Sequence, residues 1–146
     1  MANVLIVDDD AETVDVSTEL LEACGHRVRT GYNGAEGLKS LDEGRLPDCV
    51  LLDVDMPVLN GPGMAHQMLL HDAGAENIPI VLVSGRADLP EVARRIGTPY
   101  FLAKASADYG HNLLGLLDRA LRERRAPAAP AAQTTPPADL TPTPTT

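Results

Sequence analysis

The stretch CVLLDVDMP (residues 49–57) decides the fold of this chain. Four apolar residues, Cys49–Leu52, lead directly into Asp53, and a second acid, Asp55, follows two residues later. A short continuous apolar run is typical of a strand that is buried on both faces of a parallel sheet. In such sheets, ligands bind outside the carboxyl ends of the strands. The stretch therefore predicts a buried strand that places Asp53 at a ligand-binding edge.

Three other runs share this apolar pattern, and a fourth shows it more weakly. The three are Val4–Val7, Ile80–Val83 and Tyr100–Ala103, which are partly β-branched or aromatic. Arg27–Thr30 fits an edge strand. Amphipathic segments, the first over residues 11–23, separate the runs. Five strand–helix pairs in a row favour an α/β fold, with one parallel sheet covered by helices on both faces.

Capping and breaking residues mark the expected helix ends. Asp10 is expected to cap the first helix, where a carboxylate favours the positive end of the helix dipole. Asn33 and Glu36 have the spacing of a capping box, and Ser106 is expected to cap the last helix. The remaining signals are prolines near helix starts and glycines beyond helix ends, namely Pro62, Pro90, Gly25, Gly44, Gly74 and Gly97.

The 146 residues suggest one folded domain, over residues 1–125, followed by a tail. Residues 126–146 contain six Pro, six Ala and six Thr, with one charge and one Leu. Such a segment has too little apolar surface to bury a core. We therefore predict a disordered tail with extended polyproline character.

The charge is unevenly distributed along the chain. The net charge is −9, and residues 1–60 alone hold thirteen Asp or Glu against four Lys or Arg. This field disfavours direct binding of nucleic acid and suits a cation site or a basic partner surface. No apolar run is long enough for a signal peptide or a membrane span, so we expect a cytoplasmic protein without membrane association. Cys24 and Cys49 match no metal or redox spacing and are expected to be buried free thiols.

Polar residues follow four of the predicted strands. Asp8 and Asp9 come after the first strand, Asp53 after the third, Ser84 after the fourth and Lys104 after the fifth. The carboxyl ends of parallel strands meet at one edge of a sheet, so these side chains are expected to converge there.

Each residue type in this set has a chemical task. Three neighbouring carboxylates repel one another when ionised, and a hard cation such as Mg²⁺ resolves the conflict. The cation then favours phosphoryl transfer to Asp53, because a carboxylate can act as a covalent acceptor. Lys104 supplies a second positive charge, Ser84 can donate a hydrogen bond to a phosphoryl oxygen, and Gly85 is expected to leave room for the incoming group.

Over residues 3–124 the chain resembles the response-regulator receiver family of two-component signalling. The resemblance rests on a strand ending in Asp8-Asp9, on LLDVDMP with Asn60-Gly61, on Val-Ser84-Gly, and on Phe101-Leu-Ala-Lys104. It implies a doubly wound, flavodoxin-like (βα)₅ fold with strand order 2-1-3-4-5. It also implies a signalling module, not an enzyme with a separate substrate, that catalyses only its own phosphorylation and dephosphorylation.

The resemblance assigns a role to each residue of the set. Asp53 is the phosphoacceptor, Asp9 a direct Mg²⁺ ligand, and Asp8 a ligand directly or through water. The backbone carbonyl of Asp55 completes the metal site. The phosphodonor would be a sensor histidine kinase or a histidine phosphotransfer protein in a phosphorelay, and the downstream protein target is not identified. Ser84 and Lys104 sense the phosphoryl group, and Ser84 with Phe101 forms the switch that remodels the surface near the last helix.

Two features depart from the family pattern or invite a hypothesis. Ala105 follows Lys104 where the family usually has Pro, so we expect a trans peptide bond there and a less rigidly held Lys104. Asp55 and Arg86 each lie two residues beyond a site residue, at positions that modulate the lifetime of the phosphoryl group in this family. We hypothesise that their side chains pair across the mouth of the site and restrict the attacking water.

Three other functions are compatible with parts of this pattern. A pseudo-receiver would have the fold without phosphorylation, and Ala105 is the feature that favours it. A haloacid-dehalogenase-like phosphatase would also use Asp53 and Asp55, but it would carry its metal-binding acids after the lysine. A flavodoxin-like cofactor binder would need a phosphate-binding loop where this chain has three consecutive aspartates.

Overall fold

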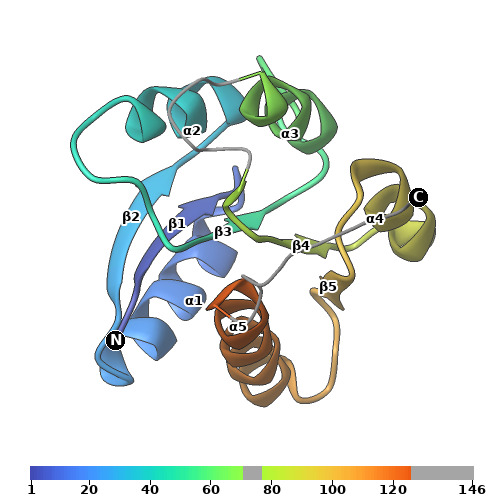
Figure 1. The fold of residues 1–146 in the computed structure, drawn as a ribbon. Helices are drawn as coiled ribbons and strands as arrows, with labels where there is room; N and C mark the ends of the chain where they lie inside the picture. The colour runs from blue at the N-terminus through green and yellow to red at the C-terminus, as the bar shows by residue number, and fades with distance from the viewer. Residues whose placement is uncertain (71–76, 126–146) are drawn as a thin grey trace, which may run out of the picture.

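The computed structural model describes residues 1–70 and 77–125, which form a single sheet covered by helices (Figure 1). The sheet is parallel, and its strand order is β2-β1-β3-β4-β5. This confirms the predicted fold and strand order. The strands are β1 (Asn3–Val7), β2 (Arg27–Gly31), β3 (Cys49–Leu52), β4 (Ile80–Ser84) and β5 (Tyr100–Ala103). The helices are α1 (Ala11–Ala23), α2 (Gly34–Leu41), α3 (Gly61–Leu69), α4 (Leu89–Ile96) and α5 (Tyr109–Arg125).

Alternate residues of the three central strands β1, β3 and β4 pack into two separate cores, one on each face of the sheet. On β1, Leu5 and Val7 pack with side chains of α2, α3 and α4, whereas Val4 and Ile6 pack with side chains of α1 and α5. Figure 1 shows the same division, with α1 and α5 on one face and the other helices opposite. Because successive side chains of a strand point to opposite faces, a strand that is apolar throughout must be covered on both sides.

The helix starts follow the sequence signals closely. The Asp10 side chain caps α1 by accepting a hydrogen bond from the backbone N–H of Glu12. Asn33 caps α2 through the N–H of Glu36, and the Glu36 carboxylate accepts from the N–H of Tyr32, one residue earlier than in a standard capping box. Both expected prolines lie in the first turn of their helices.

The observed helix ends agree with the glycine stops expected from the sequence, wherever the structure describes them. Gly97 ends α4 at φ 93°, the left-handed conformation that glycine adopts without a Cβ penalty. Gly25 (φ 88°) and Gly44 (φ 74°) adopt the same conformation shortly after α1 and α2. Helix α3 ends at Leu69, and the expected stop at Gly74 lies outside the described residues, as does the predicted tail over residues 126–146.

Two local predictions are wrong. Ser106 does not cap α5, because the helix begins at Tyr109 and the Ser106 hydroxyl instead accepts a hydrogen bond from the Asn112 side chain. Cys24 is exposed, because it lies just past the last turn of α1, where the chain leaves the core. Cys49 is buried as predicted, and burial raises the pKa of its thiol to about 12. Among the helices of the described residues, none has the length and apolar character needed to cross a bilayer.

Candidate functional site

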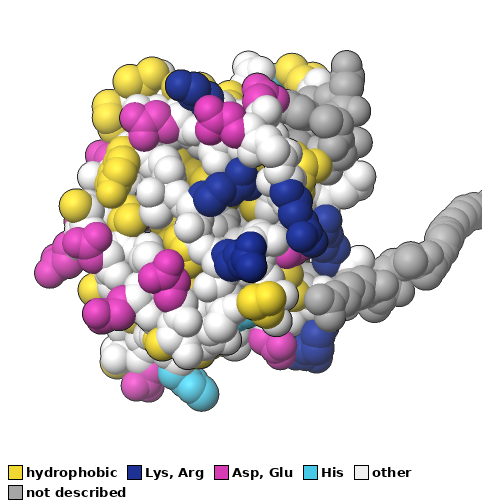
Figure 2. All heavy atoms as spheres, turned by 90° about the vertical axis from the view of Figure 1, so that its left-hand side faces the viewer, with side chains coloured by type: hydrophobic (Ala, Val, Ile, Leu, Met, Phe, Trp, Pro, Cys, Tyr) yellow, Lys and Arg dark blue, Asp and Glu magenta, His cyan; other side chains and the backbone are white. Residues whose placement is uncertain are grey.

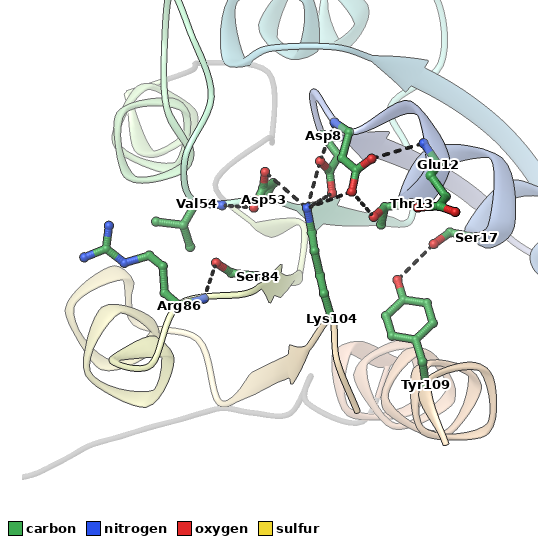
Figure 3. A network of polar contacts seen from close by, with 11 residues as sticks. Asp8, Glu12, Thr13, Ser17, Asp53, Val54, Ser84, Arg86, Lys104 and Tyr109 are labelled. Carbon is green, nitrogen blue, oxygen red and sulfur yellow. Dashed lines mark hydrogen bonds and ion pairs between the residues drawn. The ribbon is translucent and has the colours of Figure 1, made fainter. Parts of the chain in front are cut away.

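The sheet itself fixes the backbone of the residues that follow its strands. The N–H of Asp8 donates to the carbonyl of Gly31, and the N–H of Asp53 donates to the carbonyl of Val7. The N–H of Lys104 donates in the same way to Ser84, at 3.0 Å. Each bond extends the ladder of parallel strands by one residue. Asp8 and Asp53 therefore leave the adjacent strands β1 and β3, and Lys104 leaves β5 at the same edge of the sheet, where the three side chains point toward one another (Figure 3).

Three carboxylates cluster at this edge, as the sequence predicted. Asp8, Asp9 and Asp53 each offer one oxygen, and these oxygens lie within 4.8 Å of one another. Asp8 and Asp53 are buried, whereas Asp9 is exposed. Oxygen donors at this separation suit a hard divalent cation, which takes carboxylates, carbonyls and water as ligands. The donor set thus fits Mg²⁺, with Asp9 on the solvent side.

Lys104 extends from the end of β5 into the same cluster. Its Nζ lies 3.0 Å from Oδ2 of Asp8 and 3.5 Å from Oδ2 of Asp53. Burial alone would lower the pKa of Lys104, but the hydrogen bond to Asp8 and the charges of both carboxylates raise it. The lysine therefore stays charged and supplies the positive charge that the two buried carboxylates need.

Asp53 is the most perturbed acid of the cluster. Burial, together with the negative charge of Asp8, raises the pKa of Asp53 to about 7, against the opposing effect of Lys104. Its Oδ1 accepts a hydrogen bond of 2.8 Å from the N–H of Val54, which fixes the orientation of the carboxylate. A buried acid with a raised pKa and one cationic neighbour is the type of group that proteins use for chemistry.

The neighbouring Asp10 has the structural role that the sequence predicted. Its carboxylate accepts hydrogen bonds from Thr13 Oγ1 and from the N–H of Glu12, and it lies 3.9 Å from Lys104 Nζ. The Thr13 hydrogen bond, more than any other contact, lowers the pKa of Asp10. Asp10 therefore caps α1 and only borders the carboxylate cluster.

Ser84 is buried at the end of β4, and its hydroxyl accepts a hydrogen bond of 3.2 Å from the N–H of Arg86. A Cβ at Gly85 would meet no protein atom within 4 Å, so the protein does not crowd this position, and its role toward an incoming phosphoryl group stays a prediction. Gly61, to which the sequence assigned no role, is the crowded glycine. A Cβ at Gly61 would lie 2.2 Å from the carbonyl oxygen of Asp53, so a larger residue would displace the acceptor.

An exposed ion-pair network joins residues that lie two positions beyond Asp53 and Ser84 in sequence. The Arg86 guanidinium donates to Oδ1 of Asp55 at 3.0 Å, as hypothesised from the sequence. It also donates to both carboxylate oxygens of Asp88, at 2.8 and 2.9 Å, a contact the sequence did not suggest. The hydrogen bond from Arg86 lowers the pKa of Asp88. All three side chains are largely exposed, so this network lies at the surface above the buried cluster.

The two aromatic residues of β5 have opposite environments. Phe101 is 39% exposed, while the buried Tyr100 packs in the core under α1 and α5. The Tyr100 hydroxyl donates to Glu123, and its ring lies 5.1 Å from the guanidinium carbon of Arg119. Phe101 therefore lies at the surface of β5, and its role as a switch stays a prediction. The bond between Lys104 and Ala105 is trans, as expected.

A second contact near the cluster was missed from the sequence. The Tyr109 hydroxyl, at the start of α5, lies 2.9 Å from Ser17 Oγ of α1 (Figure 3). Burial raises the pKa of Tyr109, so its hydroxyl remains protonated. Together with Asp8 and Asp53, both side chains line a cavity of about 10 Å³ below the carboxylates. Neither residue directly follows a strand, so the pattern of polar residues after strands does not predict this contact.

Comparisons with known proteins agree with this geometry. Residues 4–109 match the sequence model of the response regulator receiver domain. Protein PilH from Pseudomonas aeruginosa is 40% identical over 84 residues, which cover 58% of this chain and 68% of PilH. The phosphoglycerate transport system transcriptional regulatory protein PgtA from Salmonella typhimurium is 34% identical over 126 residues, 85% of this chain.

The coverage of the relatives differs widely. The matched segment spans only 29% of PgtA, so that relative is much longer than this chain. Among solved structures, the chemotaxis protein CheY4 from Vibrio cholerae has a TM-score of 0.73 at 26% identity, over 83% of this chain and 99% of CheY4. The similarity therefore covers nearly the whole of the solved CheY4 chain and less than a third of PgtA.

Proposed function

This chain belongs to the response regulator receiver domain family, and we propose that it is a phosphorylation-dependent switch that accepts a phosphoryl group on Asp53. The observation that carries the proposal is the pairing of two buried carboxylates, Asp8 and Asp53, with the Nζ of Lys104. Buried charges are retained only where they are compensated. This arrangement supports a pocket that binds Mg²⁺ as a further cation and a phosphoryl group as a further anion.

The proposed reaction is a transfer between two covalent carriers. A carboxylate oxygen of Asp53 attacks the phosphorus of a phosphohistidine, a new P–O bond forms, and the P–N bond breaks with its electron pair leaving on the imidazole nitrogen. The donor would be a sensor histidine kinase or a histidine phosphotransfer protein. Such donors act in the cytoplasm, so the proposal places the chain there.

The acceptor must be ionised to attack, which assigns tasks to its neighbours. Lys104 favours the carboxylate form of Asp53 through its positive charge. Asp8, Asp9 and Asp53, with the backbone carbonyl of Asp55, would hold Mg²⁺, which offsets negative charge on the acceptor and on the phosphoryl oxygens. The N–H of Val54 fixes one carboxylate oxygen of Asp53 and leaves the other available for the attack.

The proposed readout runs from Ser84 to Phe101. The buried Ser84 hydroxyl would turn from the N–H of Arg86 toward the new phosphoryl oxygens. The half-exposed Phe101 would then move inward and change the surface near α4, β5 and α5 for a downstream protein. The alternative of a pseudo-receiver is less well supported, because Lys104 reaches the carboxylates even though Ala105 follows it.

The experiment that tests this function uses an acyl phosphate as the donor. The protein is incubated with acetyl phosphate, with and without Mg²⁺, and the intact mass is recorded. The wild type is expected to gain one phosphoryl group only with Mg²⁺, and Asp53→Asn is expected to gain none. Asp55→Asn is the matched control, because it removes an acid two residues away and should still react. No adduct in the wild type would reduce the chain to a pseudo-receiver.

A further inference from the structure

The basic side chains of the described residues divide into two classes. Most of them have a carboxylate partner within 4.0 Å, namely Arg86, Arg94, Arg95, Lys104, Arg119, Arg122 and Arg124. Among side chains that the structure describes, four have no such partner, and they are Arg27, Arg29, Lys39 and Arg45. These four are also the only Lys or Arg residues of the acidic segment 1–60.

The arginines of this second class surround one hollow at the edge of the sheet. Arg27 and Arg29 project from the same face of β2, since they are two residues apart on a strand. Arg45 comes from the connection between α2 and β3. Together with Asn3, Val4 and Val28, the three arginines line a hollow of about 370 Å³. Figure 2, which faces this side of the molecule, shows Lys and Arg side chains gathered near the middle of the view.

The charges around the hollow are not neutralised by their neighbours. The Arg29 guanidinium donates only to backbone carbonyls, those of Ser40, Glu43 and Arg45, at 2.8 to 3.3 Å. Carbonyls are neutral, so these bonds fix the loop that carries Arg45 while leaving the positive charge in place. The neighbouring carboxylate of Asp48 is engaged elsewhere, by the N–H of Asn3 and by Arg124. Among the residues that the structure describes, none therefore places a carboxylate oxygen within 4.0 Å of the three guanidinium groups of the hollow.

The backbone beside the hollow is also open. Within the described residues β2 pairs only with β1, so its outer edge has no strand partner. The N–H of Arg27 donates to the carbonyl of Ala2, and the carbonyl of Gly31 accepts from the N–H of Asp8. The backbone N–H and C=O groups of residues 27, 29 and 31 therefore face β1. The alternating pattern leaves the N–H and C=O groups of Val28 and Thr30 facing outward. A second copy of this chain would bring like charges together at this edge, which disfavours self-pairing.

We propose that this edge binds an acidic, extended segment of a partner protein. The segment would add a strand to β2 through the backbone groups of Val28 and Thr30. Its carboxylates, two residues apart, would meet the guanidinium groups of Arg27, Arg29 and Arg45. Carboxylate spacing along an extended chain, about 6.8 Å for alternate residues, equals the spacing of Arg27 and Arg29 along β2. The site lies along β2 and away from Asp53, so it is a docking surface separate from the phosphoacceptor pocket.

The test measures binding of a synthetic peptide of alternating Glu and Val by fluorescence anisotropy. Wild type is expected to bind it in a salt-dependent manner, and the double variant Arg27→Glu/Arg45→Glu should bind at least about tenfold more weakly. Arg94→Glu/Arg122→Glu is the matched control, because it changes the net charge equally at exposed positions on α4 and α5 and should bind as wild type does. Arg29 is left intact because it anchors a loop, and thermal denaturation confirms that both variants fold.

Two further arms test the nature of the ligand. Val28 and Thr30 amides should become protected from hydrogen exchange in the peptide complex, and a peptide N-methylated at alternate residues should not bind. Equal weakening in both double variants, or no saturable binding to wild type below about 1 mM peptide, would overturn the proposal. Tighter binding of double-stranded DNA of the same charge at this hollow would also overturn it, since the partner would then not be an acidic protein segment.

Discussion

The buried pocket around Asp53 and the ion-pair network at its mouth contain the same kinds of groups in opposite surroundings. In the pocket, Asp8 and Asp53 have side chains only 3% and 6% exposed, and Lys104 joins them. At the mouth, Arg86 joins Asp55 and Asp88, which are 65% and 47% exposed. The hydrogen-bond distances are similar in the two regions, but water screens only the second.

The difference indicates that burial, more than hydrogen-bond distance, decides how strongly each charge affects the pKa of its neighbours and the stability of the fold. In the pocket an uncompensated carboxylate has no water to stabilise it, so its pKa and the stability of the fold depend on its neighbours. At the mouth the same pairing contributes little to stability, and it can act only by shaping access to the site. Substitutions in the two regions should therefore differ in both size and kind of effect.

The largest expected effect on stability comes from Asp53→Asn in the absence of metal. Asp53 has a pKa of about 7 in the folded protein, above the ordinary value of 3.8, so the folded state binds its proton more tightly than the unfolded state does. Stability from this group is present below pH 4 and is lost as the pH rises to 7. At pH 7 the free energy of unfolding of the asparagine variant should exceed that of the wild type by up to about 4 kcal/mol. Urea denaturation measures this difference.

The difference in free energy of unfolding between variant and wild type should increase from pH 4 to pH 7 and remain constant above pH 7. Saturating Mg²⁺ should narrow it, because the cation stabilises the charged form of Asp53. A gap that does not depend on pH would mean that burial of Asp53 has no electrostatic consequence. The comparison between the two regions would then fail.

The next effect in size is expected for Lys104→Gln. Removing the ammonium leaves Asp8 and Asp53 without a cation in a buried site, so the metal-free protein should lose about 2 kcal/mol of unfolding free energy at pH 7. Mg²⁺ should restore stability to this variant more than to the wild type. Lys39→Gln is the control, since Lys39 has no carboxylate partner among the described residues, and it should unfold as the wild type does.

Arg86→Ala tests the exposed region and should have a kinetic effect only. The guanidinium bridges Asp55 and Asp88, and under the hypothesis that this bridge restricts the attacking water, its removal should open the path for water. The phosphorylated form is expected to hydrolyse about threefold faster, a change of the size that one exposed ion pair can produce. Arg94→Ala, which removes an exposed ion pair on α4, should leave the lifetime unchanged. An unaltered lifetime in both variants would show that the mouth does not control access.

The smallest effect is expected for Ala105→Pro. Proline after Lys104 would restrict the backbone that positions the Nζ over the carboxylates. Phosphorylation by acetyl phosphate should become about twofold to threefold faster, because less freedom is lost when Lys104 engages the phosphoryl group. Equal rates in stopped-flow measurements would show that the contacts of Lys104 with Asp8 and Asp53 already hold it in place.

Most of the fold and the centre of the site could be predicted from the sequence. The strands and the cluster of Asp8, Asp9, Asp53 and Lys104 follow from short apolar runs that end in a polar residue, whereas the strand order was implied only by the resemblance to the receiver family. This works because a parallel sheet brings consecutive strand ends to one edge, so order along the chain becomes proximity in space.

The remaining contacts could not be predicted, because they join positions that no periodicity links. The Tyr109–Ser17 contact joins two helices, and Asp88 reaches Arg86 through a local turn. Val58 adopts φ 68°, although a β-branched residue disfavours that conformation, so its local preference gave no signal. Gly61 was visible in the motif, but only the structure explains it, because a Cβ at this position would lie 2.2 Å from the carbonyl oxygen of Asp53.

The most direct test of the central claim is to identify the residue that carries the phosphoryl group. The protein is phosphorylated with acetyl phosphate and Mg²⁺, reduced with borohydride, which converts an aspartyl phosphate to homoserine, and mapped by peptide mass spectrometry. We expect homoserine at position 53 alone. Homoserine at position 8 or 9 instead, or at none of the three, would contradict the assignment of Asp53 as the acceptor.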